Sequence, residues 1–431
     1  MRQIRSEYEF NEFYEVLKRR GEFDVEILAT VTKILQGVKE RGDAEVRELT
    51  RLFDGITLDS FRLSQDTVDE YAARVDDAFL EALKMAHRRI NVYHHKQVES
   101  SWNFSDSHGV LGQVIRPLRR VGLYVPGGKA AYPSTVLMNA IAAQVAGVRE
   151  IALCVPTPHG EINPHVMAAI KLTGITEVYR IGGAQAIAAM AFGTESIKGV
   201  DKIVGPGNIY VALAKKLVFG MVDIDMIAGP SEILIVADQS ANPVFIAADL
   251  LSQAEHDEMA SSVLITTSEA LAQSVTEELQ RQLAALTRKE IASASLSAFG
   301  AIVVVDSTER AFDYVNRIAP EHLEIMTEEP EHTLPLIQNA GAIFLGQWSA
   351  EVIGDYAAGP NHTLPTGGSA RFFSPLGVYD FIKRSSLINL SRNGFNALAA
   401  ETQLLAQTEG LQGHANAVRV RREDISPAGN G

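Results

Sequence analysis

Short apolar runs alternate with amphipathic stretches through the middle of the chain. The runs IALCVP, EILIVAD, VLITTS and AIVVVDS are each bounded by turn residues, a pattern typical of buried strands. Apolar residues at helical spacing follow them, as in SEALAQSVTEELQRQLAAL. Such alternation with short turns is the signature of parallel α/β sheets. Two successive series of this kind, at about 121–231 and 232–346, predict two doubly wound units.

The two ends of the chain have helical periodicity instead of this alternation. The first hundred residues are rich in Glu, Arg, Leu and Ala and have helical periodicity with glycine at the stops, and Asn396–Thr408 is a second long amphipathic stretch. A single hydrophobic core rarely grows beyond about 250–300 residues, and the chain has 431. We therefore predict an α/β protein with two doubly wound, incomplete Rossmann-like parallel-sheet domains plus helical N-terminal and C-terminal segments. The predicted regions are an N-terminal helical region (1–108), a first α/β domain (109–231), a second α/β domain (232–371) and a helical C-terminal tail (372–431).

Charge and composition exclude several classes of protein. The net charge of −14, from 39 basic and 53 acidic residues, argues against nucleic acid or an anionic membrane surface as a partner. No apolar run approaches the roughly 18 residues of a membrane span, and the charged N-terminus has no signal-peptide core. Cys154, the single cysteine, lies in an apolar run and is interpreted as a core residue. These features predict a cytoplasmic protein without an internal disulfide.

The stretch Asp223–Asp257 contains the first candidate site. Asn242 and Pro243 provide an N-cap and a first helical residue, and the helix that they start ends on Gln253-Ala254-Glu255-His256. Gln253 and His256 are three residues apart and so share a face. The pair could be half of a metal site, although a solvated polar helix end is the more common structure.

Three glycine-rich turns follow predicted strands. They are Pro126-Gly127-Gly128, Gly182-Gly183-Ala184-Gln185 and Gly205-Pro206-Gly207-Asn208. Glycine lets backbone N–H groups approach a phosphate at a helix N-terminus, but the same turns also occur as ordinary connections between strands and helices. Since no G-x-G-x-x-G fingerprint is present, the residues leave both interpretations open.

Other polar residues gather in three places. Glu321 and His322 are adjacent after a predicted helix and are interpreted as lying on a turn. The stretch Gly354–Thr366, which contains Asp355 and His362, is dense in Gly and Pro and is predicted to be a loop. Glu409 and His414 lie beside two glycines near the C-terminus. Because zinc takes imidazole and carboxylate ligands, the candidates for a zinc site are Gln253, His256, Asp355 and His414, with the amide of Gln253 the least usual ligand.

Several long, irregular motifs resemble those of the histidinol dehydrogenase family. In chain order they are GLYVPGG, IGGAQAIAA, GPGN, AGPSE with LLSQAEH, APEHLEI and GDYAAGPNHTLPT, and the resemblance covers about residues 25–420. It implies NAD-dependent oxidation of L-histidinol to L-histidine through L-histidinal. It also implies a homodimer with one zinc per subunit, in which C-terminal residues complete the partner's site.

The resemblance also assigns roles to individual residues. It implies Gln253, His256, Asp355 and His414 as zinc ligands; Glu321 and His322 as the acid–base pair; Tyr124, Gln185 and Asn208 as NAD contacts; and Ser231, His362 and Glu409, together with His322 and the zinc ligands, as substrate contacts. Imidazole can accept the alcohol proton near neutral pH, so His322 is expected to be the base and Glu321 to activate water in the second oxidation. Zinc would anchor the substrate's imidazole and amine.

Three alternatives remain from the sequence. One is the same family acting on another small alcohol, which Glu409 disfavours if that substrate is anionic. Another is a zinc hydrolase in which Glu321 activates water and no nicotinamide binds. The third is a non-catalytic α/β protein that binds a small molecule.

Overall fold

The structure is a computed structural model that describes residues 1–21, 24–127 and 132–423. By its contacts the chain divides into two compact units. The main unit comprises Met1–Val98 and Leu118–Phe381, and the small unit comprises Glu99–Pro117 and Ile382–Gly431. The boundaries predicted at 108, 231 and 371 remain predictions.

The first parallel sheet lies in the main unit. Its five strands, in order across the sheet, are β6 (Glu177–Tyr179), β5 (Glu150–Cys154), β4 (Arg120–Tyr124), β7 (Lys202–Val204) and β8 (Asp223–Ile224). Numbered along the chain, the order is 3-2-1-4-5, that of a mononucleotide-binding unit, so the strand order reverses between β4 and β7. This reversal places the ends of β4 and β7 side by side.

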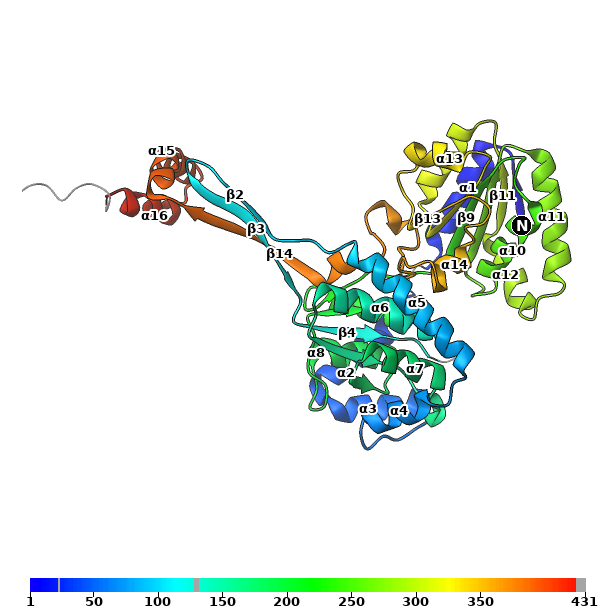
Figure 1. Ribbon diagram of the computed structural model, residues 1–431, viewed down its shortest axis with the longest axis horizontal. Helices are drawn as coiled ribbons and strands as arrows, with labels where there is room; N and C mark the ends of the chain where they lie inside the picture. Colours follow the sequence, from blue (N-terminus) through cyan, green and yellow to red (C-terminus); the bar gives the residue numbers. More distant parts are fainter. Residues whose placement is uncertain (22–23, 128–131, 424–431) are drawn as a thin grey trace, which may run out of the picture. The chain divides into compact units, whose positions relative to one another are not determined.

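Helices cover both faces of the first sheet (Figure 1). One face packs against α2 (Val25–Arg41), α3 (Asp43–Phe53), α8 (Gly183–Phe192) and α9 (Ile209–Val218), and the other against α4 (Gln65–Ala72), α5 (Asp77–His95), α6 (Pro133–Ala146) and α7 (Pro164–Thr173). Burial on both faces explains the continuous apolar runs of these strands. Cys154, as predicted, is a buried core residue of β5.

The second parallel sheet repeats this order and adds one strand. Across the sheet lie β1 (Arg2–Ile4), β11 (Ala301–Val304), β10 (Ser261–Thr266), β9 (Glu232–Ala237), β12 (His322–Met326) and β13 (Ala342–Leu345). The predicted strand at Ile233–Ala237 is confirmed as β9. The N-terminal residues, predicted only as part of a helical region, form β1, which pairs in parallel with β11 at the sheet's edge.

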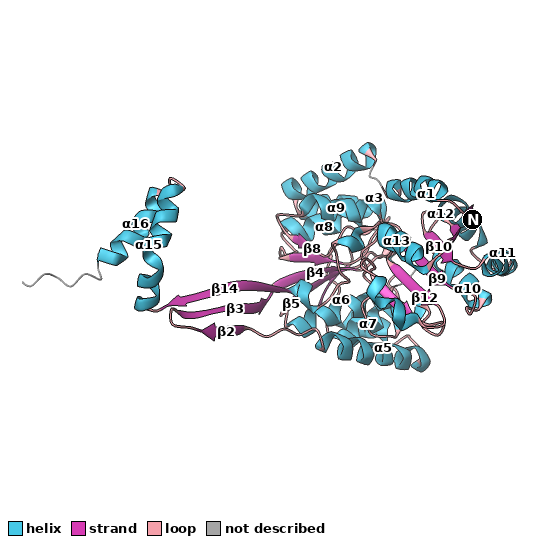
Figure 2. Ribbon diagram, turned by 90° about the horizontal axis from the view of Figure 1, so that it is seen from above, coloured by secondary structure: helices cyan, strands magenta, loops and turns pink. Residues whose placement is uncertain are grey.

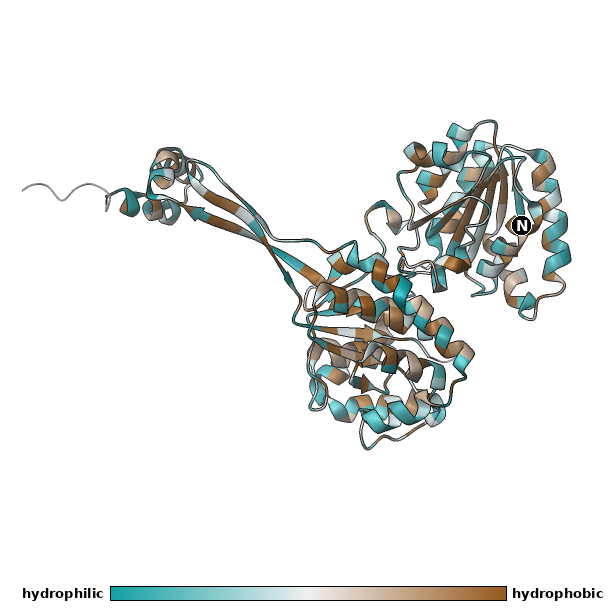
Figure 3. Ribbon diagram, in the orientation of Figure 1, coloured by the Kyte–Doolittle hydropathy of each residue, from teal (hydrophilic) through white to brown (hydrophobic). Residues whose placement is uncertain are grey.

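Alternate residues of β9 face opposite layers of helices. Ile233, Ile235 and Ala237 pack with α10 (Pro243–Ala254), α11 (Glu269–Leu283) and α12 (Lys289–Phe299). Leu234 and Val236 pack with α1 (Glu7–Arg19) and α13 (Thr308–Ile318). The strands of this sheet are correspondingly hydrophobic along their length, whereas the surrounding helices alternate in hydropathy (Figure 3).

The small unit is a three-stranded antiparallel sheet followed by two helices (Figure 2). Its elements are β2 (Trp102–Ser105), β3 (Gly109–Pro117), β14 (Ile382–Leu390), α15 (Arg392–Thr408) and α16 (Gln412–Glu423). The two helices confirm the helical C-terminal segment, but β14 was not predicted. β14 pairs with β3 over its whole length, from Ile382 opposite Pro117 to Leu390 opposite Gly109.

The remaining regular elements are short. They are α14 (Glu351–Tyr356) and the 3-10 turns Pro158–Gly160, Pro330–Leu336, Ser369–Arg371 and Val378–Phe381. None of the helices in the described part of the chain combines the length and the apolar character of a membrane span.

Candidate active site

Glu321 and His322 lie at the amino end of β12, next to the amino end of β9. The prediction of a turn is wrong for His322, which is the first residue of β12 and pairs with Ile233 of the neighbouring strand; Glu321 lies in the bend directly before the strand. Both side chains are buried. The two side chains lie close together, with Oε2 of Glu321 3.7 Å from Nδ1 of His322.

The backbone of Glu232 holds both side chains. Its N–H donates to the Glu321 carboxylate at 2.9 Å, and its carbonyl oxygen lies 2.9 Å from Nδ1 of His322. The carbonyl can only accept, so Nδ1 carries the proton and Nε2 is the atom that remains available. No described group forms a hydrogen bond with Nε2 of His322.

Two further carboxylates surround Nε2 of His322. Glu351 Oε1 and Asp355 Oδ1, both from α14, each lie 3.7 Å away. Among the described residues, ligand atoms of these three side chains lie within 4.8 Å of one another and could hold a cation. Asp355 belongs to the predicted zinc set. Glu351 does not, and His322 was predicted as the base.

Burial and the closely packed acidic side chains shift the pKa values in this cluster. Burial raises the pKa of Glu321 to about 8, and burial raises the pKa of Glu351 to about 7. Burial disfavours the charged ring of His322, but the Glu321 carboxylate and then Asp355 and Glu351 outweigh it and raise the pKa of His322 to about 10. A cation bound here would repel the ring's proton and so favour the neutral base.

Gln253 and His256 approach from α10. The helix ends at Ala254, so His256 lies on the following turn and donates its backbone N–H to the carbonyl of Gln253 at 3.2 Å. Gln253 is only 1 % exposed, yet neither its side-chain oxygen nor its nitrogen has a partner among the residues that the structure describes. A buried amide without partners is costly, which indicates a missing ligand for its oxygen.

His256 is an exposed residue, although protein atoms surround much of its ring and desolvate it. This desolvation lowers the pKa of His256, and the nearby Asp355 carboxylate opposes the shift. A neutral imidazole is the form that binds a metal. The Gln253 amide oxygen, the His256 imidazole and the Asp355 carboxylate are donors of kinds that zinc accepts, so the chemistry of these residues fits zinc.

His362 and Ser231 complete the polar residues predicted in the main unit. His362 Nδ1 lies 3.0 Å from the carbonyl of Asp355, and Nε2 lies 3.3 Å from the Thr135 hydroxyl on α6. Burial lowers the pKa of His362. Ser231 precedes β9 directly and is half-buried. The segment containing Asp355, predicted as loop throughout, begins within helix α14 and becomes irregular only after Tyr356.

Glu409 and His414 belong to the small unit. Glu409 is the C-cap residue of α15, and His414 lies in the first turns of α16. Both are exposed. The roles predicted for them, in substrate binding and in zinc binding, remain predictions.

The three predicted NAD contacts lie at the carboxyl ends of strands in the first sheet or in the turns that follow. Tyr124 ends β4, Gln185 lies in the first turn of α8, and Asn208 is the N-cap of α9. The Tyr124 hydroxyl accepts the backbone N–H of Gly183 at 3.0 Å, and burial raises its pKa. Gln185 is buried with its side-chain oxygen unpartnered. The Asn208 oxygen caps α9 through Tyr210 and Val211, so its amide nitrogen is the group left for a ligand.

The Gly205 turn cannot accommodate a side chain. Gly205 has φ +118°, and a Cβ there would collide with the carbonyl oxygen of Tyr124. Its N–H donates to Asp225 at 2.7 Å, its carbonyl accepts from Lys215 at 2.9 Å, and these two buried side chains pair with each other. In the first glycine-rich turn, Gly127 lies against Pro156, whereas Gly128 lies outside the described residues.

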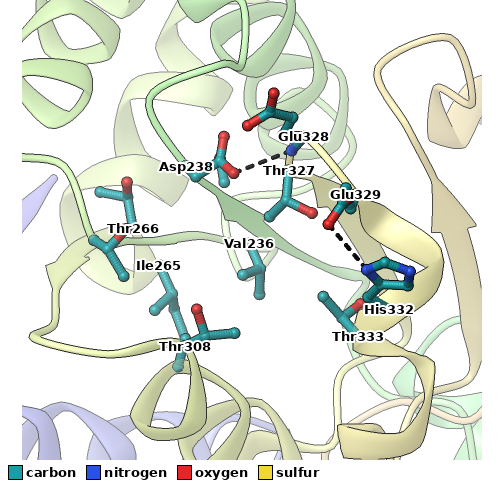
Figure 4. A pocket seen from close by; sticks show the side chains of 13 residues that line it. Val236, Asp238, Ile265, Thr266, Thr308, Thr327, Glu328, Glu329, His332 and Thr333 are labelled. Carbon is teal, nitrogen blue, oxygen red and sulfur yellow. Dashed lines mark hydrogen bonds and ion pairs between the residues drawn. The ribbon is translucent and has the colours of Figure 1, made fainter.

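A separate pocket of about 240 Å³ lies at the opposite, carboxyl edge of the second sheet (Figure 4). Hydroxyl and acidic side chains line it. Asp238 accepts the backbone N–H of Glu328 at 3.0 Å, and Glu329 pairs with His332. This acidic lining disfavours a dinucleotide's phosphates, in contrast to the glycine-rich edge of the first sheet.

The sequence analysis did not predict the buried acidic residues that lie near the acid–base pair. Glu351 donates its backbone N–H to the Glu324 carboxylate at 2.7 Å. Burial raises the pKa of Glu324 and also that of Asp249, whose charge adds to the shift at Glu324. Glu232 lies in the predicted strand EILIVAD, and no role in the site was predicted for it. The available signal was an acid within a buried apolar run, as in EILIVA and HLEIM, because a lone buried carboxyl needs a partner.

Comparison with known proteins identifies the family. The family model for histidinol dehydrogenase matches residues 17–422. The chain is 54 % identical over 424 residues to a histidinol dehydrogenase of Aquifex aeolicus, covering 97 % of this chain and 98 % of that protein, and 52 % identical over 403 residues to one of Listeria innocua, covering 93 % and 94 %. The crystal structure of histidinol dehydrogenase from Elizabethkingia anophelis superposes with a TM-score of 0.94 at 38 % identity, covering 99 % of this chain and 98 % of that one. The chain therefore belongs to the histidinol dehydrogenase family and is an oxidoreductase.

Proposed function

We propose that the protein oxidises L-histidinol to L-histidine through L-histidinal, with two molecules of NAD, in the last steps of histidine biosynthesis. The observation that carries the proposal is the buried pair Glu321 and His322, whose orientations are both held by the backbone of Glu232. An alcohol oxidation followed by an aldehyde oxidation needs a base for the alcohol and a base for water, and this pair supplies two.

His322 is the base for the alcohol. Its Nδ1 proton is held by the Glu232 carbonyl, so Nε2 can take the hydroxyl proton. Glu321 lies beside it and activates water for the second oxidation. Its raised pKa, about 8, means that it can hold a proton or release one near neutral pH.

Gln253, His256 and Asp355 are the residues of the main unit that would hold one zinc per subunit, and His414 of the partner subunit would complete the set. Zinc would bind the imidazole and amine of the substrate and polarise it as a Lewis acid. Ser231, His362 and Glu409 would contact the substrate, and the Glu409 carboxylate suits its ammonium group. An alcohol without these nitrogens would leave buried polar groups unpaired and be rejected.

Tyr124, Gln185 and Asn208 would bind NAD at the carboxyl edge of the first sheet. NAD accepts hydride when bound. Support comes from the unpartnered Gln185 oxygen and from the glycine-rich turns, where backbone N–H groups can approach phosphates at the N-terminal ends of α8 and α9. We further propose a cytoplasmic homodimer with shared active sites and with no nucleic acid or membrane partner.

The direct test mixes purified, zinc-loaded protein with NAD and L-histidinol and follows NADH. We expect two NADH for each L-histidinol consumed. Hydrolysis without NADH formation would instead support a zinc hydrolase, and a higher kcat/KM on another small alcohol would change the substrate.

Variants of the acid–base pair separate the two oxidations. His322→Asn should lower kcat on L-histidinol by about 10²–10⁴-fold, the usual contribution of a positioned base. Glu321→Gln should lower the oxidation of added L-histidinal by a similar factor but affect the first oxidation less. Single-turnover NADH bursts from each substrate distinguish these results, and equal losses on both substrates with Glu321→Gln would contradict the assignment.

A further inference from the structure

A buried ion pair between Arg20 and Glu232 connects the end of helix α1 to the candidate acid–base pair. Arg20 is the C-cap residue of α1, and 212 positions separate it from Glu232. Its guanidinium donates to the Glu232 carboxylate and, at 3.4 Å, to the carbonyl of Pro230. Both side chains are nearly inaccessible, with 1 % and 9 % exposure.

The carboxylate of Glu232 also accepts two backbone hydrogen bonds. One oxygen accepts the backbone N–H of Gly367 at 3.1 Å, and the other accepts the backbone N–H of Glu321 at 3.3 Å. The backbone of the same residue holds the Glu321 carboxylate and the His322 ring. Glu232 and Glu321 thus bind each other reciprocally, each carboxylate to the other's N–H.

This arrangement needs a cation. When Glu321 is ionised, as it must be to activate water, its carboxylate and that of Glu232 repel each other in one desolvated place, and the repulsion would push Glu232 away from Glu321. The Arg20 guanidinium is permanently charged and neutralises Glu232 through Oε1, whereas the Glu321 N–H binds Oε2. We infer that Arg20 and Glu232 are positioning residues, which fix Glu321 and His322 in the orientation for both proton transfers.

The inference rests on the roles proposed for Glu321 and His322. An error of about 1 Å in such a group can cost about 10²-fold in rate. Arg20→Met should therefore lower kcat on L-histidinol by about 10- to 100-fold and leave the KM for NAD unchanged. Arg20→Lys keeps the charge and should recover part of the loss.

A matched control separates positioning from stability. Arg120 is also a buried arginine, paired with Glu177 at 2.8 Å at the amino end of β4, away from the candidate site residues. Arg120→Met should lower Tm comparably, and the folded protein should keep its kcat. The same fall in kcat with Arg120→Met would overturn the inference.

Two double variants decide the mechanism. Arg20→Met combined with Glu232→Gln leaves no unpaired charge, so Tm should recover from that of Arg20→Met while kcat stays low; kcat that recovers with Tm would show a merely structural role. Glu232→Gln should also lower the L-histidinal rate much less in a Glu321→Gln background than alone. An undiminished effect there would overturn the inference, whereas a wild-type protein that makes no NADH would overturn the proposed function itself.

Discussion

At the scale of single residues, the candidate site contains buried polar groups that lack hydrogen-bond partners in the described part of the chain. The Gln253 amide has none there, and Nε2 of His322 has no hydrogen bond. Buried polar atoms are nearly always satisfied in folded proteins, so such atoms mark where a ligand belongs. The family resemblance gave the same residues from their motifs, and the structure adds a physical reason for Gln253.

The zinc assignment predicts a selective loss of metal affinity. His256→Asn should weaken zinc binding by more than about 100-fold. Even residues that only hydrogen-bond to a metal ligand typically contribute about 10- to 100-fold to metal affinity, and a direct ligand should contribute more. A competition titration with a chelator measures this. His165→Asn, an exposed histidine on α7, is the control and should bind zinc like the wild type. Equal affinities for the wild type and His256→Asn would remove His256 from the ligand set.

The raised pKa of Glu321 predicts a pH-dependent stability of the zinc-free protein. Burial raises this pKa from 4.5 to about 8, so between these values the folded state holds a proton that the unfolded state has lost. The free energy of unfolding should therefore fall as pH rises through this window. Glu321→Gln cannot titrate and should lack that part of the slope. Urea unfolding of both proteins at about pH 5 and about pH 8 tests the difference; parallel curves would contradict the pKa shift.

At the scale of elements, the sequence predicted the buried strands, which are apolar runs, and missed the exposed strand β14, which has no such pattern. The strands of both parallel sheets are apolar runs because helices cover both faces, so β9 was recognised from Ile233–Ala237. In β14 all residues after Ile382 are exposed, and IKRSSLINL has no period-2 apolar pattern. Its partner β3 is 265 or more positions away, and such long-range pairing leaves no local signal.

The same contrast explains the site. Local motifs gave Gln253 with His256, and Glu321 with His322. The role of Glu232 depends on a register that places His322 opposite Ile233. The approach of Arg20 depends on how α1 packs on the second sheet. Neither arrangement is encoded in spacing along the chain.

The Gly205 turn allows an element-scale prediction with a matched control. Gly205 and Gly220 both have positive φ, +118° and +97°, but a Cβ at Gly220 meets nothing within 4 Å. Gly220→Ala should cost about 1–2 kcal/mol from backbone strain alone. Gly205→Ala should cost more than about 3 kcal/mol, because the methyl also collides with the Tyr124 carbonyl, and should raise the KM for NAD. Urea unfolding and NAD titration check both values; equal costs would show that the turn relaxes freely.

At the scale of the whole molecule, the small unit exposes several large apolar side chains. Its exposed large apolar side chains include Trp102, Phe104, Ile388, Leu404 and Leu405, which are 51–69 % accessible. An uncovered surface of this kind marks an interaction site, and a second copy of the chain is the commonest partner for such a surface. This supports the proposed homodimer.

The shared-site proposal predicts complementation between two inactive variants. Each site would combine Asp355 of one subunit with His414 of the other, so a heterodimer of His414→Asn and Asp355→Asn chains contains one intact site and one doubly altered site. We expect about half of the wild-type activity from isolated heterodimers, since one of two sites is intact. Each homodimer should be inactive. No recovery in verified heterodimers would place His414 and Asp355 in the same subunit's site or remove one of them.

The short strand β1 has a consequence for how the protein behaves in concentrated solution. Arg2–Ile4 pair with Ala301–Val303 and so cover the backbone of β11, which would otherwise form the border of the second sheet. An unpaired border offers free N–H and C=O groups to any other extended chain. With β1 in place the border is a strand of only three residues that carries the exposed charged side chain of Arg2, and a very short, charged edge strand limits pairing with another chain. Trimming or crowding these residues would uncover β11 and favour aggregation while leaving the chemistry of each molecule intact.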